Sequence, residues 1–189
     1  MDKKTKSTIL LVAGFAVLMI AAAFLYGVLA PKIAPNNMQS ASSGENTQTA
    51  QTVPDFTVYD KEGNEVQLSD YFGKPIVLNF WASWCGPCKM EMPEFNEMWE
   101  ELEGNVQFLM VNVTDGQQET VDSASSYVES QGYTFPVFYD TTLQASLGYQ
   151  AYSLPTTFFI DENGVGIAKA TGSITKDQLQ QGIEMIYNP

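Results

Sequence analysis

The sequence feature that most limits how this chain can fold is a pair of cysteines set between an apolar segment and an amphipathic one. Cys85 and Cys88 are the only cysteines in the 189 residues. The run before them, residues 75–81, is apolar and rich in β-forming residues, which predicts a buried central strand. The segment after them repeats apolar side chains with helical spacing, at Phe95, Met98, Trp99 and Leu102. The pair therefore lies where a strand ends and a helix begins.

This position has chemical consequences for the two thiols. A thiolate at Cys85 would face free backbone N–H groups at the positive end of the helix, and these lower the pKa of a thiol. Pro87 suits the first helical turn, where a missing N–H is tolerated. Cys88 lies one turn further along the same side of the helix and can close a disulfide with Cys85. A thiol of low pKa beside a second thiol is the arrangement that thiol–disulfide exchange requires.

Two other uses of the cysteine pair fit the sequence less well. A structural disulfide that closes so short a loop removes little entropy from the unfolded chain. A zinc site needs four ligands, and with two cysteines and no histidine in the chain only a dimer could supply them. We therefore predict a redox-active pair, without a metal or a cofactor, in a protein that we expect to be a monomer.

Three segments carry a resemblance to a known family. Residues 80–89, FWASWCGPCK, resemble the active-site segment of thioredoxin, and residues 153–161, SLPTTFFID, resemble the cis-proline segment of that superfamily. Residues 53–57, VPDFT, narrow the resemblance to membrane-anchored thiol–disulfide oxidoreductases of the TlpA/ResA type, which are related to the AhpC/TSA redoxins. The resemblance covers residues 53–189.

The chain before residue 53 divides into three parts by composition. Residues 1–8 carry three lysines, and residues 9–30 form an uncharged apolar run of 22 positions. As a helix this run would be about 33 Å long, enough to cross a membrane, with residues 1–8 in the cytoplasm. Residues 31–52 are mostly polar or small and predict a flexible tether. A cleaved signal peptide is the alternative for residues 9–30, although Pro31 should obstruct cleavage.

The pattern of residues 53–189 predicts a single α/β domain. An N-terminal hairpin is expected over residues 56–68, with Ser69 capping a short helical turn. Further segments alternate between strand and helix, and a second hairpin precedes a final helix. We expect strands at residues 75–81, 106–113, 136–139, 156–160 and 165–170. Helices are expected after Cys88 and at residues 117–131, 143–147 and 175–187. This order predicts a mixed central sheet with helices on both faces. Compared with thioredoxin, the resemblance implies an added N-terminal hairpin and an inserted helix–strand unit at residues 117–140.

The charge of this domain limits its partners. Residues 53–189 contain 5 Lys, no Arg and 20 Asp plus Glu, which gives 5 − 20 = −15. So acidic a surface argues against binding of nucleic acid or anionic lipid.

The resemblance also implies a substrate groove beside the dithiol. In the family, a proline at the position of Pro155 forms a cis bond after Leu154, and the backbone of that preceding residue pairs with the substrate chain. Gly172 matches a glycine that lines the groove, and Trp84 is expected to be exposed beside Cys85, with Gly86 and Pro87 contributing to the same surface. The alternatives are a proline that only starts an edge strand and a glycine that only forms a turn.

Three further residues bear on which group accepts the proton that the Cys88 thiol must lose during exchange. Thioredoxins carry a buried Asp at the position of Asn79, and an amide cannot titrate. Glu91 matches an acidic residue that TlpA/ResA-type proteins carry near the dithiol, where partial burial would raise its pKa and allow proton exchange with Cys88. Asp115 matches a second family acid less closely. An ordinary surface carboxylate remained the alternative for Glu91.

The resemblance implies a membrane-tethered bacterial protein whose extracytoplasmic domain reduces disulfides in exported proteins, such as apocytochrome c or a sulfoxide reductase. The implied electron donor is a membrane thiol transporter of the CcdA/DsbD kind. One alternative is a redoxin-type peroxidase, but such enzymes use a Thr where this chain has Ala82, and an Arg, which this chain lacks. The other is a non-catalytic binding module, which leaves the dithiol at the helix terminus unexplained.

Overall fold

The computed structural model describes Met19, Met38–Ser40 and residues 52–187. The predicted membrane anchor, residues 9–30, and most of the predicted tether, residues 31–52, lie outside the described part of the chain. Among the residues that the structure does describe, no helix combines the length and the apolar character needed to cross a membrane.

The domain is built on one mixed sheet of eight strands in the order β1-β8-β7-β4-β5-β6-β2-β3. The central strands β4, β5 and β6 are parallel, and β7 lies antiparallel to β4 on its other side. The strands are β1 (Met38–Ser40), β2 (Thr57–Tyr59), β3 (Glu65–Gln67), β4 (Ile76–Trp81), β5 (Gln107–Asn112), β6 (Val137–Tyr139), β7 (Thr156–Ile160) and β8 (Gly166–Thr171).

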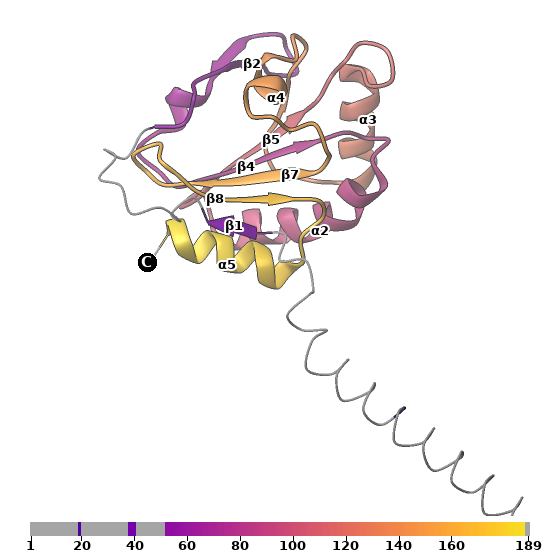
Figure 1. Cartoon of the computed structure of the whole chain (residues 1–189). Coiled ribbons are helices and arrows are strands. Elements are labelled where there is room, and N and C mark those ends of the chain that lie inside the picture. Colours follow the sequence, from indigo (N-terminus) through magenta and orange to yellow (C-terminus); the bar gives the residue numbers. More distant parts are fainter. Residues whose placement is uncertain (1–18, 20–37, 41–51, 188–189) are drawn as a thin grey trace, which may run out of the picture. The chain divides into compact units, whose positions relative to one another are not determined.

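Every residue of β4 is buried, because both faces of the sheet are covered. The helices are α2 (Gly86–Glu101), α3 (Val121–Gln131), α4 (Gln144–Gly148) and α5 (Lys176–Ile186), with a 3₁₀ helix at Leu68–Tyr71. Val77 and Trp81 face the core shared with α2, α3 and α5, whereas Leu78 and Phe80 face a second core beneath α4 and the N-terminal hairpin. Figure 1 shows α2 and α5 on one side of the sheet and α4 on the other. The predicted mixed sheet with helices on both faces is confirmed.

Most predicted elements are present with slightly shifted ends. The N-terminal hairpin is β2–β3, the inserted unit is α3–β6, and the C-terminal hairpin is β7–β8. Two details were wrong. The helix expected over 117–131 begins only at Val121, because Thr120 forms a capping box with Ser123. Ser69 lies inside the 3₁₀ helix instead of capping it; its hydroxyl donates to Asp55 Oδ2 at 2.7 Å.

Strand β1 was not expected from the sequence. It lies within residues 31–52, whose composition predicted only a tether, yet it pairs antiparallel with β8 at the edge of the sheet. The register places Gln39 opposite Lys169. An edge strand of this length is held by backbone hydrogen bonds, which any sequence without proline can provide, so composition gave no signal for it.

Candidate active site

The two cysteines lie where the central strand passes into α2, as the sequence predicted. A turn after β4 is closed by a hydrogen bond from Cys85 N–H to the carbonyl of Ala82, at 3.1 Å. Cys85 is the N-cap residue of α2, and its sulfur accepts a hydrogen bond from the backbone N–H of Cys88 at 3.2 Å. Cys85 and Cys88 form a disulfide, and their Cα atoms are 5.3 Å apart. A thiolate at Cys85 would keep this N–H contact and would be stabilised by it.

The surroundings of the two sulfurs differ in exposure. Cys88 is fully buried, and Cys85 keeps 4% of its surface exposed. Trp84 is 49% exposed, and Gly86 and Pro87 are exposed at the start of α2. A partner approaching the disulfide therefore meets Trp84 and the first turn of α2, and reaches the sulfur of Cys85 before that of Cys88.

The loop before β7 brings a second group of predicted residues to the same end of the sheet. The Leu154–Pro155 bond is cis. Because Phe80 pairs with Thr156 in the β4–β7 register, Pro155 lies beside the end of β4, where the turn to Cys85 begins. β7 lies between β8 and β4, so the proline does not start an edge strand.

The structure joins Gly172 to this loop by a direct contact. Its N–H donates to the carbonyl of Pro155 at 2.8 Å, and its backbone adopts a positive φ of 85°, which favours glycine. Leu154 is half-buried. The predicted groove residues Leu154, Pro155 and Gly172 therefore form one connected backbone unit.

Glu91 lies one helical turn after Cys88 and is 1% exposed, so the surface alternative is wrong. Its Oε1 accepts a hydrogen bond from Asn79 Nδ2 at 2.9 Å, and its Oε2 accepts one from the backbone N–H of Ile174 at 2.9 Å. Burial raises the pKa of the Glu91 carboxyl from 4.5 to about 7, although these two hydrogen bonds oppose the change. A carboxyl with this pKa exchanges protons near neutral pH.

Asn79 connects this carboxyl to the cis-proline strand. Its Nδ2 also donates to Thr157 Oγ1 at 3.0 Å, while its Oδ1 is buried and has no hydrogen-bond partner among the described residues. The contacts of Asn79 and Ile174 with Glu91 could not be predicted from the sequence, because they join residues 12 and 83 positions apart.

Asp115, the second candidate acid, is exposed and shapes a loop. Its Oδ1 accepts hydrogen bonds from the backbone N–H groups of Gln117, Gln118 and Glu119, at 2.8, 2.8 and 2.9 Å. These bonds lower the pKa of the Asp115 carboxyl, that from Glu119 most strongly. Asp115 therefore acts as an acceptor that folds the segment before α3.

The residue that sequence reasoning missed is Glu119. It is fully buried, and its carboxylate contacts Ser83, two residues before Cys85. The expected helix start at Gln117 hid this role, because a loop rather than a helix carries the side chain.

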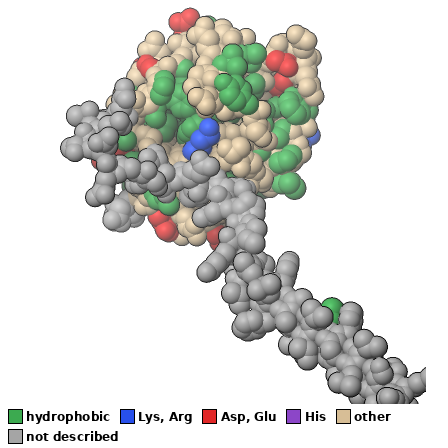
Figure 2. Space-filling model, viewed as in Figure 1, with side chains coloured by type: hydrophobic (Ala, Val, Ile, Leu, Met, Phe, Trp, Pro, Cys, Tyr) green, Lys and Arg blue, Asp and Glu red, His purple; other side chains and the backbone are tan. Residues whose placement is uncertain are grey.

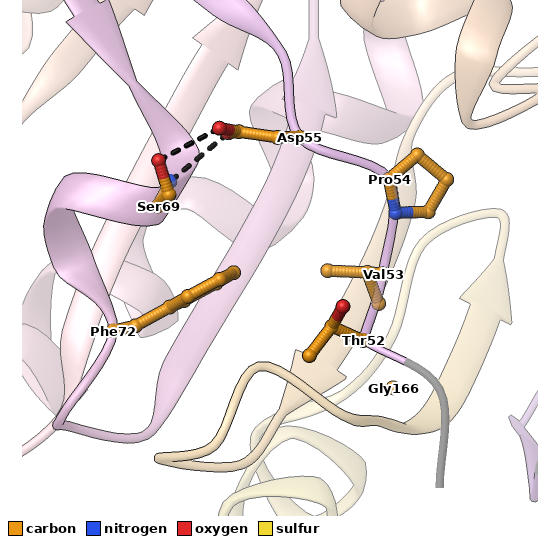
Figure 3. Close-up of a pocket in the computed structure, with 7 residues that line it drawn as sticks. All are labelled: Thr52, Val53, Pro54, Asp55, Ser69, Phe72 and Gly166. Atoms are coloured by element: carbon orange, nitrogen blue, oxygen red, sulfur yellow. Dashed lines mark hydrogen bonds between the residues drawn. The ribbon is translucent and has the colours of Figure 1, made fainter. Parts of the chain in front are cut away.

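A cleft lined by described residues lies away from the dithiol. Its volume is about 740 Å³, and Figure 3 shows its lining residues Thr52, Val53, Pro54, Asp55, Ser69, Phe72 and Gly166. Phe72 and Gly73 precede β4, whereas the dithiol follows its carboxyl end. Asp55, from the VPDFT motif, here bonds the backbone N–H and hydroxyl of Ser69, so this motif residue ties the first hairpin together.

Acidic side chains are dispersed over the face seen in Figure 2. Two lysines of the domain are neutralised locally: Lys61 pairs with Glu129, and Lys176 lies 2.7 Å from Glu97.

Comparison with known proteins places this geometry in a family. The model of the AhpC/TSA family matches residues 49–167. Thiol-disulfide oxidoreductase ResA of Geobacillus kaustophilus is 40% identical over 136 residues, which are 71% of this chain and 76% of that protein. ResA of Bacillus subtilis is 32% identical over 143 residues, covering 75% of this chain and 78% of that protein.

Solved structures agree. A putative thiol:disulfide interchange protein DsbE from Chlorobium tepidum superposes with a TM-score of 0.64 at 31% identity, covering 74% of this chain and 97% of that one. A DsbF homologue from Corynebacterium diphtheriae gives 0.67 at 26% identity, with 80% and 94% covered. The fold is thus thioredoxin-like, and its Cys85–Cys88 pair, with CxxC spacing, forms a disulfide. The chain belongs to the AhpC/TSA family, and within it to the ResA-type thiol–disulfide oxidoreductases.

Proposed function

We propose that this protein is a membrane-tethered reductant of disulfides in exported bacterial proteins, with apocytochrome c or a sulfoxide reductase as its partner. The observation that carries the proposal is the buried carboxyl of Glu91, one turn behind a dithiol at a helix N-terminus. Residues 9–30 provide the anchor, residues 1–8 stay in the cytoplasm, and a thiol transporter of the CcdA/DsbD type restores the dithiol.

The exchange runs in two steps. The Cys85 thiolate attacks one sulfur of the substrate disulfide, forming a mixed disulfide and releasing the other substrate sulfur as a thiolate. Cys88 then loses its proton and attacks the sulfur of Cys85, which frees the second substrate thiolate. Two electrons pass from the dithiol to the substrate, and the protein is left with the Cys85–Cys88 disulfide seen in the structure.

We expect Glu91, one helical turn after Cys88, to take the proton of Cys88 in the second step. With a pKa of about 7, a substantial fraction of the carboxyl is ionised at neutral pH and free to accept a proton. Asn79 supports both states, because its Nδ2 bonds the carboxylate and a 180° rotation of the amide would present Oδ1 to a protonated Glu91.

The substrate chain is expected to lie between Trp84 and the Leu154–Pro155 loop. Trp84 offers exposed apolar area next to Cys85. The family resemblance implies that the backbone of Leu154, directly before Pro155 and β7, pairs with the substrate chain.

Reduction of insulin by the full-length protein tests the activity, with peroxide consumption measured in parallel. We expect dithiothreitol-driven insulin reduction that requires both cysteines, and no peroxide consumption above the rate of free thiols. Peroxide turnover without insulin reduction would refute the proposal in favour of a peroxidase.

Partner and direction are tested in cells. In a strain that lacks this gene, the target should accumulate in its disulfide form, and expression of the parent protein should restore its thiols. Loss of the CcdA/DsbD-type transporter should leave this protein oxidised. A protein that remains reduced without any such transporter would contradict the proposed electron supply.

A further inference from the structure

Glu119 is a buried carboxylate that the exchange steps do not use. It lies in the loop between β5 and α3 and has no exposed surface. Its Oε2 accepts hydrogen bonds from the backbone N–H and the hydroxyl of Ser83, at 3.1 and 2.9 Å. Its Oε1 accepts one from Asn112 Nδ2 at 3.1 Å. A carboxylate removed from water is costly unless hydrogen bonds of this kind replace the water.

The donors around Glu119 are of the kind that a carboxylate accepts. Thr114 donates its hydroxyl to Asn112 Oδ1 at 2.7 Å, and in this orientation of the amide Nδ2 faces Glu119. The N–H of Ser83 is a donor only. Each oxygen of the Glu119 carboxyl thus accepts a hydrogen bond from an N–H group: Oε2 from Ser83 and Oε1 from Asn112.

The contact with Ser83 reaches the turn that carries the reactive cysteine. This turn starts at Ala82 and is closed by the N–H of Cys85, so Ser83 and Trp84 are its two central residues. Glu119 is itself held by the loop, since its N–H donates to Asp115 and its carbonyl accepts from Gly116. The inserted unit is thereby bonded directly to the active-site turn.

We propose that Glu119 is a positioning residue for the dithiol, which fixes the Ala82–Cys85 turn and disfavours a second negative charge on Cys85. The inference rests on exchange through Cys85. Glu119 bonds Ser83, two residues before Cys85, and a buried negative charge opposes formation of a second one nearby, because little water screens the two. By fixing this turn, Glu119 also holds Trp84 and Cys85 in position for a protein substrate.

Three variants of the full-length protein separate charge from geometry. Glu119→Gln keeps the length of the side chain and removes its charge. Glu119→Asp keeps the charge but is one methylene too short to hold Ser83. Asp140→Asn is the matched control, because Asp140 is also fully buried and accepts two backbone N–H groups, those of Ala145 and Ser146, at the start of α4.

The first measurement is the pKa of the Cys85 thiol, from thiolate absorbance against pH in a Cys88→Ala background. Glu119→Gln should lower this pKa by about 0.5 or more, whereas Glu119→Asp and Asp140→Asn should leave it near the parent value. Lys89 and Glu91, the charged side chains of α2 nearest to the dithiol in sequence, are the same in all variants. A fall of the same size in the Asp140→Asn protein, or none in Glu119→Gln, would overturn the charge part of the proposal.

The second measurement compares insulin with a small disulfide as substrate, in proteins that retain both cysteines. Glu119→Asp should lower kcat/KM for insulin by about tenfold and change reduction of the small disulfide much less, because only the protein substrate needs the fixed turn. Equal losses for both substrates, or none for insulin, would overturn the geometric part. The thiol pKa needs no substrate, so this test stands even if the parent protein does not reduce insulin.

Discussion

The sharpest consequence of the structure concerns the stability of the Glu91→Gln variant at different pH values. Glu91 is 1% exposed, and burial raises its pKa from 4.5 to about 7. Between these values the folded protein holds a proton that the unfolded chain releases. The unfolding free energy of the parent protein therefore falls as pH rises through this window.

The size of the effect follows from the two pKa values. The stabilisation by the protonated carboxyl is complete below about pH 4.5 and is lost as the pH passes through about 7. At about 1.4 kcal/mol for each pKa unit, the difference corresponds to roughly 3 kcal/mol. Glutamine does not titrate, so this part of the pH dependence should be absent from the variant, while the acidic surface residues contribute equally to both proteins.

Urea denaturation of the oxidised proteins between pH 5 and pH 8 measures this difference, because cysteines in a disulfide do not titrate. From pH 5 to pH 8, the parent should lose about 2 to 3 kcal/mol more unfolding free energy than Glu91→Gln. Glu162→Gln, in the exposed turn between β7 and β8, is the control and should follow the parent. Parallel curves for the parent and Glu91→Gln would show that the carboxyl titrates near its ordinary pKa, and the proton-transfer role would lose its basis.

Four further predictions follow from the site and the fold. Glu91→Gln should slow release of the mixed disulfide and flatten its pH dependence in single-turnover reduction of a peptide disulfide between about pH 5 and 9; an unchanged profile would mean that the proton leaves through water. Cys88→Ala should trap mixed disulfides with substrates and Cys85→Ala should trap none; equal trapping would contradict Cys85 as the attacking thiol. Gly182→Ala should destabilise the domain by about 1–3 kcal/mol in urea denaturation, because the added Cβ would overlap the ring of buried Phe159; the small gain usual for Gly→Ala in a helix would refute this packing. Fractionation should find the full-length chain in membranes with its domain open to external protease; a soluble form beginning near Pro31 would sink the anchor prediction.

The parts of the fold that the sequence predicts well are those set by local pattern. The run at 75–81 has no charged residue after Lys74 and is rich in β-branched and aromatic side chains, so a buried strand was the one interpretation that its composition allowed. The position of the dithiol followed, because Pro87 marks the first turn of the next helix. The turn at Asp161-Glu162-Asn163-Gly164 likewise fixed the β7–β8 hairpin, and Gly164 takes the positive φ that such a turn needs.

The parts that the sequence predicts poorly depend on partners far away in the chain. Nothing in residues 38–40 distinguishes them from the rest of a polar segment, and only the open edge of β8 makes them a strand. The start of α3 was placed four residues early, because Gln117, Gln118 and Glu119 are good helix formers. Asp115 Oδ1 accepts hydrogen bonds from the N–H groups of these three residues, so the backbone forms a turn there. The helix begins only after the N-cap residue Thr120.

The same dependence explains why only one of the two buried carboxylates at this site could be proposed in advance. The domain has 20 acidic residues, and the family resemblance singles out Glu91, which lies one turn from Cys88. Glu119 is 34 positions away from Cys85 and joins the site through Ser83. The two differ in what surrounds them: Glu91 meets two donors and has its pKa raised by burial, whereas Glu119 meets three donors from Ser83 and Asn112. One carboxyl is thus suited to gaining and losing a proton beside Cys88, and the other to accepting the hydrogen bonds that hold the turn before Cys85.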